Sequence, residues 1–93
     1  MIKTFADKRT AAIFSGIVTK GIPADVVRRA GAKLQQIDAA TGLDFLRVPP
    51  ANHLELLKGR RAGQHSIRVN GQWRICFRWA DGDAYDVEFC DYH

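Results

Sequence analysis

The sequence predicts an α+β fold in which two helices pack on one face of an antiparallel sheet, in the order β-α-α-β-β-β. Two observations carry this prediction. Residues 8–40 place apolar side chains at helical spacing, whereas residues 63–93 alternate apolar and polar side chains between turn signals. A chain of 93 residues that is 46% hydrophobic is expected to form one domain over residues 1–93, with a single modest core.

The first part of the chain is predicted to hold one short strand and two helices. Residues 2–5 alternate like a strand that adds to the later sheet. Asp7 is expected to cap a helix over residues 8–18, and Pro23 suits the first turn of a second helix that ends near Ala40. The apolar stripes of both helices are expected to face the core.

The segment between the second helix and the meander is predicted to be irregular. Pro49 and Pro50 exclude a helix there. Residues 54–58 then return apolar side chains to the core, and residues 59–63 are predicted to form a flexible basic loop.

Positive charge gathers in the later part of the chain. The formal net charge of +4 favours polyanionic partners such as nucleic acid or an acidic protein segment. No apolar run approaches the length of a membrane span, and the first residues lack the apolar stretch of a secretory signal, so we expect a cytoplasmic protein without a membrane partner. The clustered cations are Lys58, Arg60, Arg61, Arg68, Arg74 and Arg78.

The last third is predicted to be a β-meander whose odd-numbered apolar residues share one face. A three-residue loop over residues 70–72 pairs Val69 with Trp73 and keeps the two faces separate, which a two-residue loop would not. Arg68 then lies opposite Arg74 on the polar face. Because facing like charges cost a few tenths to roughly 1 kcal/mol, this pair indicates an anion between or above them. The alternative, that both arginines extend into water, stays open.

The second hairpin is predicted to carry an internal ion pair. A three-residue loop over residues 81–83 would place Arg78 opposite Asp86, a pair that needs no ligand. The same register leaves Tyr85 on the apolar face of the sheet.

The two cysteines are predicted to be reduced thiols. In the same register Cys76 faces Glu88 and Cys90 faces Arg74, so the cysteines are diagonal neighbours that are poorly placed for a disulfide. With two cysteines and no pair of histidines at ligand spacing, we expect no zinc site, no other metal and no cofactor.

The arginine face and the C-terminus together offer the groups that RNA cleavage needs. The reaction takes a proton from the 2′-hydroxyl, protonates the leaving 5′-oxygen and steadies the phosphate with cations. His53 and His65 have no evident partner in the sequence and are interpreted as surface or packing residues. The candidates for the chemistry are Glu55, Lys58, Arg68, Arg74, Tyr92 and His93.

Two segments of the sequence resemble the HigB-type toxins of bacterial toxin-antitoxin systems, within the RelE/ParE superfamily. One is residues 57–79, with Ser-Ile-Arg-Val-Asn-Gly-Gln-Trp-Arg-Ile-Cys-Phe at 66–77. The other is the ending Asp91-Tyr92-His93. The resemblance covers nearly the whole chain and implies a RelE-like microbial ribonuclease fold.

The resemblance also implies an activity and partners. The protein is expected to be a ribosome-dependent, metal-independent endoribonuclease that cuts mRNA in the decoding site and inhibits translation. A HigA-type helix-turn-helix antitoxin is expected to silence it, and operator DNA is expected to be bound only through that antitoxin.

The resemblance implies roles for particular residues as well. Arg74 would contact the scissile phosphate, and Asp91, Tyr92 and His93 would line the active site. Lys58 would belong to the basic loop, with Arg60 and Arg61, that faces ribosomal RNA. Some members carry a histidine at the place of Glu55, so whether Glu55 or His93 is the general base stays open.

Two other functions remain as alternatives. A ParE-like toxin would poison DNA gyrase without cutting mRNA. A non-catalytic RNA-binding domain would need only the basic loop and the arginine face.

Overall fold

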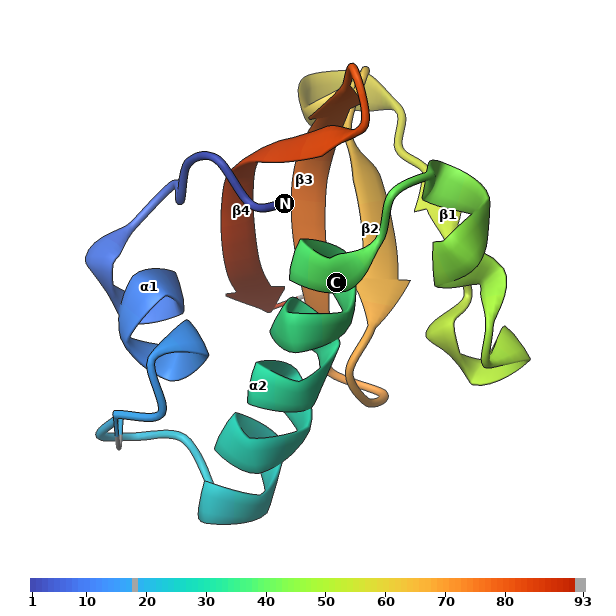
Figure 1. Ribbon diagram of the computed structural model, residues 1–93. Coiled ribbons are helices and arrows are strands. Elements are labelled where there is room, and N and C mark those ends of the chain that lie inside the picture. The colour runs from blue at the N-terminus through green and yellow to red at the C-terminus, as the bar shows by residue number, and fades with distance from the viewer. Residues whose placement is uncertain (18, 92–93) are drawn as a thin grey trace.

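A computed structural model describes residues 1–17 and 19–91 (Figure 1). Within these residues, two α-helices pack against one face of a four-stranded antiparallel sheet with the strand order β1-β2-β3-β4. The predicted α+β class is therefore confirmed. The helices are α1 (Lys8–Phe14) and α2 (Ala24–Ala39), and the strands are β1 (Glu55–Leu56), β2 (His65–Arg68), β3 (Trp73–Ala80) and β4 (Asp83–Asp91).

The first helix begins where predicted and ends earlier. Asp7 caps α1, with its Oδ1 accepting from the backbone N–H of Thr10 at 2.7 Å. The helix stops at Phe14 because Gly16 takes a left-handed φ of 81°. The N–H groups of Gly16 and Ile17 then bond back to the last turn, at 3.1 and 2.9 Å, in a Schellman arrangement. The predicted extension over residues 15–17 is wrong for this reason, and residue 18 lies outside the described residues.

The predicted N-terminal strand is replaced by two isolated bridges along β4. Ile2 bridges to Ala84 and Phe5 bridges to Val87, both in parallel orientation. The missed strand is β1, which pairs with β2 at the other edge of the sheet. The element order is therefore α-α-β-β-β-β rather than β-α-α-β-β-β.

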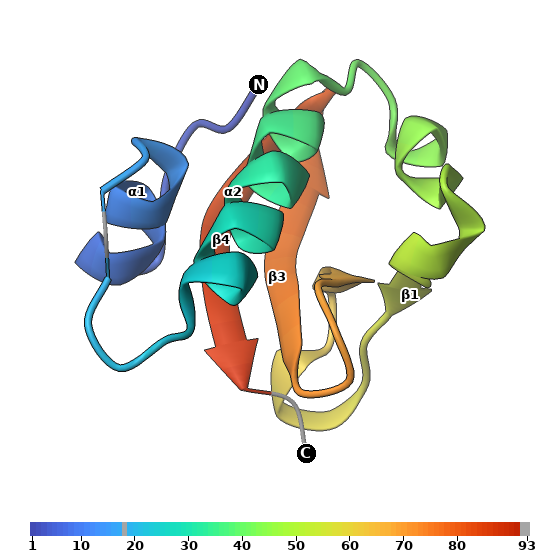
Figure 2. The ribbon, with the colours of Figure 1, turned by 90° about the horizontal axis from the view of Figure 1, so that it is seen from below.

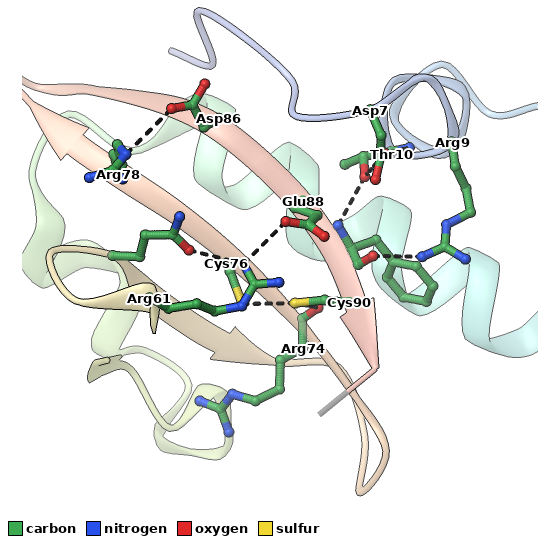
Figure 3. A network of polar contacts seen from close by, with 12 residues as sticks. Asp7, Arg9, Thr10, Arg61, Arg74, Cys76, Arg78, Asp86, Glu88 and Cys90 are labelled. Atoms are coloured by element: carbon green, nitrogen blue, oxygen red, sulfur yellow. Dashed lines mark hydrogen bonds and ion pairs between the residues drawn. The ribbon is translucent and has the colours of Figure 1, made fainter. Parts of the chain in front are cut away.

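The outer edge of β4 is also covered by side chains of α1. The N–H of Phe89 donates to Thr10 Oγ1 at 2.9 Å, and its carbonyl accepts from Arg9 at 2.8 Å (Figure 3). Both backbone groups of this edge residue are thereby satisfied. The contacts fix α1 beside β4, on the opposite side of the sheet from β1 (Figures 1 and 2).

The β2–β3 hairpin has the predicted register. Ile67 pairs with Ile75 and Arg68 pairs with Arg74. The turn is closed by Asn70, whose Oδ1 accepts from the N–H groups of Gln72 and Trp73, each at 2.8 Å. An asparagine side chain that bonds its own backbone in this way stabilises the turn locally.

The β3–β4 hairpin differs from the prediction. Its loop has two residues, Asp81 and Gly82, whose φ values of 52° and 81° suit a type I′ turn. The register then shifts between Cys76 and Arg78, beside Asp86, which has a φ of 53°. This bulge restores the predicted register for the rest of β4.

Between the turn and the bulge, the residues of β4 lie on the opposite face from the one predicted. Ala84 is buried in the core where Tyr85 was expected, and Tyr85 pairs with Arg78 on the other face. Arg78 nevertheless forms its ion pair with Asp86, with 3.4 Å between Nε and Oδ2.

The core lies between the helices and the odd-numbered face of the sheet. Its fully buried residues include Ile13, Ala30, Leu34, Ile37, Leu46, Ile67, Ile75, Phe77, Ala84, Val87 and Phe89. No helix in residues 1–17 or 19–91 is long and apolar enough to cross a membrane.

The even-numbered face of the sheet is partly covered rather than fully solvated. Ser66, Cys76 and Cys90 on this face are buried, and Leu57 packs on the two cysteines. The covering segment contains the 3-10 turn η3 (Gly59–Arg61), so the predicted flexible loop has regular structure. This cover leaves one end of the face open, where the candidate site lies.

Candidate functional site

The candidate site is a cleft of about 280 Å³ at the open end of the even-numbered face. It brings together the three strands β1, β2 and β3, the turn between β2 and β3, and the segment that precedes β1. Its lining residues are His53, Glu55, Arg68, Asn70, Gly71 and Arg74.

Arg74 is the fixed cation of the cleft. It is buried, and its Nε donates to Ser66 Oγ at 2.8 Å. Its Nη2 donates to the carbonyl of His53 at 2.7 Å and lies 3.1 Å from Glu55 Oε1. Partners on three sides hold the guanidinium in one orientation, which preorganises its charge for an anion.

Arg68 faces Arg74 across the strands but is exposed. It forms no ion pair with any residue in the described part of the chain. Glu55 relieves the repulsion at Arg74, whereas the charge of Arg68 has no such compensation. The predicted pairing of Arg68 with Arg74 is therefore confirmed. The two side chains differ in burial and in ion pairing.

Glu55 is half exposed, with 45% of its side chain accessible, and its carboxylate lies on the cleft side of Arg74. Its place on β1 opposite Ser66 brings it there. The sequence grouped Glu55, Arg68 and Arg74 as candidates, and all three line the cleft.

His53 is the residue of the cleft that the sequence interpretation missed. It follows the 3-10 turn η2 (Pro50–Asn52) and takes a left-handed φ of 46°, which turns its carbonyl toward Arg74. Alternation along a strand could not have found it, because the left-handed residue His53 does not belong to an extended segment with Glu55.

Asn52 fixes the backbone beside His53. Its side chain is fully buried, and Nδ2 donates to Gln36 Oε1 and to the carbonyl of Leu46, both at 3.1 Å. Its Oδ1 accepts from Lys33 on α2. Because these contacts reach α2 and the 3-10 turn η1 (Leu43–Arg47), they tie the cleft to the core.

The basic loop lies outside the cleft, and its three cations differ from one another. Lys58 and Arg60 are exposed. Arg61 Nη1 instead donates to Gln64 Oε1 and Glu88 Oε1, each at 3.1 Å, and the bond to Glu88 raises the pKa of Arg61. Arg61 thus ties the loop to β4 above the cysteine pair (Figure 3).

The two cysteines are free thiols, as predicted, and are buried beneath Arg61. Their Sγ atoms lie 2.8 Å apart, close enough for one thiol to donate to the other. This contact, followed by the charge of Arg61, lowers the pKa of Cys76, whereas the same contact and burial raise the pKa of Cys90. The pair forms the floor between the basic loop and Arg74.

The C-terminal candidates are described only in part. Asp91 ends β4 opposite Trp73, and its Oδ2 accepts from Gln72 Nε2 at 3.2 Å. Tyr92 and His93 lie outside the described residues. Cys90, the residue before Asp91, pairs with Arg74.

Comparison with known proteins gives the relatives of this chain. The family model for the RelE-like toxin of the type II toxin-antitoxin system HigB matches residues 3–93. Endoribonuclease HigB from Proteus vulgaris is 43% identical over 93 residues, which are 100% of both chains. Toxin HigB-1 from Vibrio cholerae is 42% identical over 66 residues, which are 71% of this chain and 70% of that protein.

Solved structures share the fold at low sequence identity. A chain of the YoeB-YefM complex from Staphylococcus aureus aligns with a TM-score of 0.62 at 17% identity, covering 100% of this chain and 98% of that one. The YoeB dimer from the same organism aligns with a TM-score of 0.60 at 18% identity, covering 99% and 97%. With the near-complete match to the family model, these findings place the chain in the HigB-like family of RelE-like toxins of type II toxin-antitoxin systems.

Proposed function

We propose that this toxin is an endoribonuclease that cuts mRNA on the ribosome and thereby inhibits translation. The observation that carries the proposal is the cleft in which His53 and Glu55 meet the facing pair Arg68 and Arg74. The relative from Proteus vulgaris, 43% identical over the whole chain, is named an endoribonuclease, which supports the same activity here.

In the proposed reaction the RNA supplies its own nucleophile. The 2′-oxygen loses its proton and attacks the adjacent phosphorus, the bond to the 5′-oxygen breaks, and that oxygen gains a proton. The products are a 2′,3′-cyclic phosphate and a free 5′-hydroxyl. Arg74 holds the scissile phosphate, and Arg68 adds positive charge as negative charge builds up on the phosphate oxygens.

The arrangement favours different tasks for Glu55 and His53. Glu55 is engaged with Arg74 at 3.1 Å, so we assign it to positioning that arginine. His53 lines the cleft and forms no ion pair with another described residue, so its imidazole is the better proton acceptor for the 2′-hydroxyl. Tyr92 remains the proposed orienter or proton donor for the leaving group, and Asp91 and His93 remain proposed active-site residues.

The proposed partners follow from the same assignment. Lys58 and Arg60 are exposed cations that can face ribosomal RNA, whereas Arg61 serves the fold. A HigA-type helix-turn-helix antitoxin would silence the toxin in the cytoplasm, and operator DNA would be met only through the antitoxin. The family description as a toxin of a toxin-antitoxin system supports the antitoxin partner.

The experiment is to map mRNA 5′ ends in a purified translation system, with and without the protein. We expect new ends in translated mRNA and a loss of at least about 100-fold in rate for Arg68→Gln and Arg74→Gln. Arg78→Gln is the matched control, because its ion pair with Asp86 lies outside the cleft. The proposal fails if translated mRNA stays intact, or if both cleft variants cut at the wild-type rate.

A further inference from the structure

A second cleft adjoins the candidate site on the side of α2. Its volume is about 350 Å³, and it shares His53, Arg68, Asn70 and Gly71 with the first cleft. The two clefts therefore form one continuous depression across the β2–β3 turn. The second cleft adds Arg29, Lys33, Ala51 and Val69 to these four residues.

Two cations of α2 distinguish the second cleft. Arg29 and Lys33 stand four residues apart, so they share one face of the helix. Burial, followed by the charge of Arg29, lowers the pKa of Lys33. The helix thus holds two like charges together at this wall, an arrangement that an anion would stabilise.

Acidic side chains do not offset these charges. No Asp or Glu lines the second cleft. Within residues 1–17 and 19–91, neither Arg29, Lys33 nor Arg68 forms an ion pair. Three cations therefore face one depression, whereas the charges of Arg61, Arg74 and Arg78 are each met by a carboxylate.

Lys33 is held in place rather than extended into water. Its Nζ donates to Asn52 Oδ1, and Asn52 is fully buried. The same asparagine fixes the backbone beside His53. Asn52 therefore supports both clefts, and the fold sets the relative positions of Lys33 and Arg74.

We propose that the second cleft is a phosphate subsite, in which Arg29 and Lys33 bind the RNA phosphate next to the scissile one. Arg68 lies at the boundary and contacts both phosphates. The ligand is single-stranded RNA, because adjacent phosphates on one flexible strand can follow the continuous depression across the turn. This inference rests on the proposed function, since it places the scissile phosphate at Arg74.

The first test measures binding without cleavage. A short single-stranded RNA with a 2′-O-methyl group on every ribose cannot supply the nucleophile, so its affinity can be followed by fluorescence anisotropy over about 50–200 mM salt. For Arg29→Gln we expect binding at least about 3-fold weaker, with a salt slope reduced by about 0.7, the loss of one phosphate contact on a single strand.

The chain offers a matched control and a rescue. Arg28→Gln changes the same residue type one position away, but Arg28 lines an apolar cleft between α1 and α2 instead. Arg28→Gln and Arg29→Lys should both keep the wild-type salt slope. Lys33→Gln should reduce the slope like Arg29→Gln, provided that its thermal unfolding shows an intact fold.

The second test separates this inference from the proposed function. Cleavage of ribosome-bound mRNA should show a raised KM for Arg29→Gln with little change in kcat, since Arg29 lies away from the reacting atoms. If the wild-type protein cuts no mRNA but the RNA affinity depends on Arg29, the proposed activity fails and the subsite stands. Equal affinities and salt slopes for Arg28→Gln and Arg29→Gln overturn the subsite. A loss of antitoxin binding alone in Arg29→Gln also overturns it and assigns the cleft to an acidic protein segment.

Discussion

Arg68 and Arg74 lie directly opposite each other on β2 and β3, yet one is exposed and the other is buried and paired with Glu55. The two arginines therefore have different surroundings. Arg74 has its orientation set by Ser66, His53 and Glu55. Arg68 is exposed, lines both clefts and forms no ion pair with another described residue.

Replacing Arg74 should cost stability as well as activity. Arg74→Gln removes the donors that satisfy Ser66 Oγ and the carbonyl of His53, so we expect the free energy of unfolding to fall by about 1–3 kcal/mol. Urea denaturation measures the difference. Arg78→Gln loses only an exposed ion pair and should stay within about 0.5 kcal/mol of wild type. Equal losses in the two variants would contradict the anchoring role of Arg74.

Replacing His53 should reduce activity without unfolding the protein. The side chain is exposed, and it is the backbone carbonyl rather than the imidazole that accepts from Arg74. A general base contributes typically about 100- to 10,000-fold, so His53→Gln should slow mRNA cleavage by that order with unchanged thermal unfolding. His65→Gln, outside the cleft, should cut mRNA normally. If His53→Gln is fully active, the general base is Glu55 or His93 and not His53.

Replacing Asn52, which fixes the backbone beside the cleft, should lower the free energy of unfolding. Asn52→Ala removes the donor to Gln36 and Leu46 and the acceptor for Lys33, all in a fully buried position. Unpaired buried groups make this costly, and we expect a loss of about 2–4 kcal/mol in urea denaturation. Gln35→Ala, whose exposed amide makes a 3.4 Å contact to Phe14, is the control and should be nearly neutral.

His65 should make stability depend on pH. Burial, followed by the charge of Arg47, lowers the pKa of His65, and its buried Nδ1 has no hydrogen-bond partner among the described residues. The unfolded chain binds this proton more tightly than the folded protein, so stability is full above the unfolded pKa of about 6.5 and falls as the pH drops below it. Urea denaturation at several pH values should show a smaller fall for His65→Asn. An identical fall would exclude His65 as the cause.

The two hairpins show how far the sequence could predict register. Around Asn70, alternation and turn chemistry favoured the same pairing, and Arg68 opposite Arg74 was predicted correctly. In the next hairpin the turn Asp81-Gly82 is two residues long, and the bulge at Asp86 compensates for it. The shorter loop could not be read from the sequence, because beyond the bulge the residues of β4 pair as they would after a three-residue loop.

The site was only partly predictable for a similar reason. Arg68, Arg74 and Glu55 were found from strand pairing and from the family resemblance. The place of His53 depends on Asn52, whose partners lie on α2 and η1, and no local pattern reveals such contacts. The pairing of Arg61 with Glu88 depends likewise on the loop folding back over the sheet.

The central claim, that the cleft around Arg74 cuts RNA by attack of its own 2′-hydroxyl, is tested most directly by identifying the ends of cleaved mRNA. Translating ribosomes incubated with the wild-type protein should yield 2′,3′-cyclic phosphate and 5′-hydroxyl ends. Arg68→Gln should yield few of either. Ends that carry a 5′-phosphate, or undiminished cleavage by Arg68→Gln and Arg74→Gln alike, would contradict the claim.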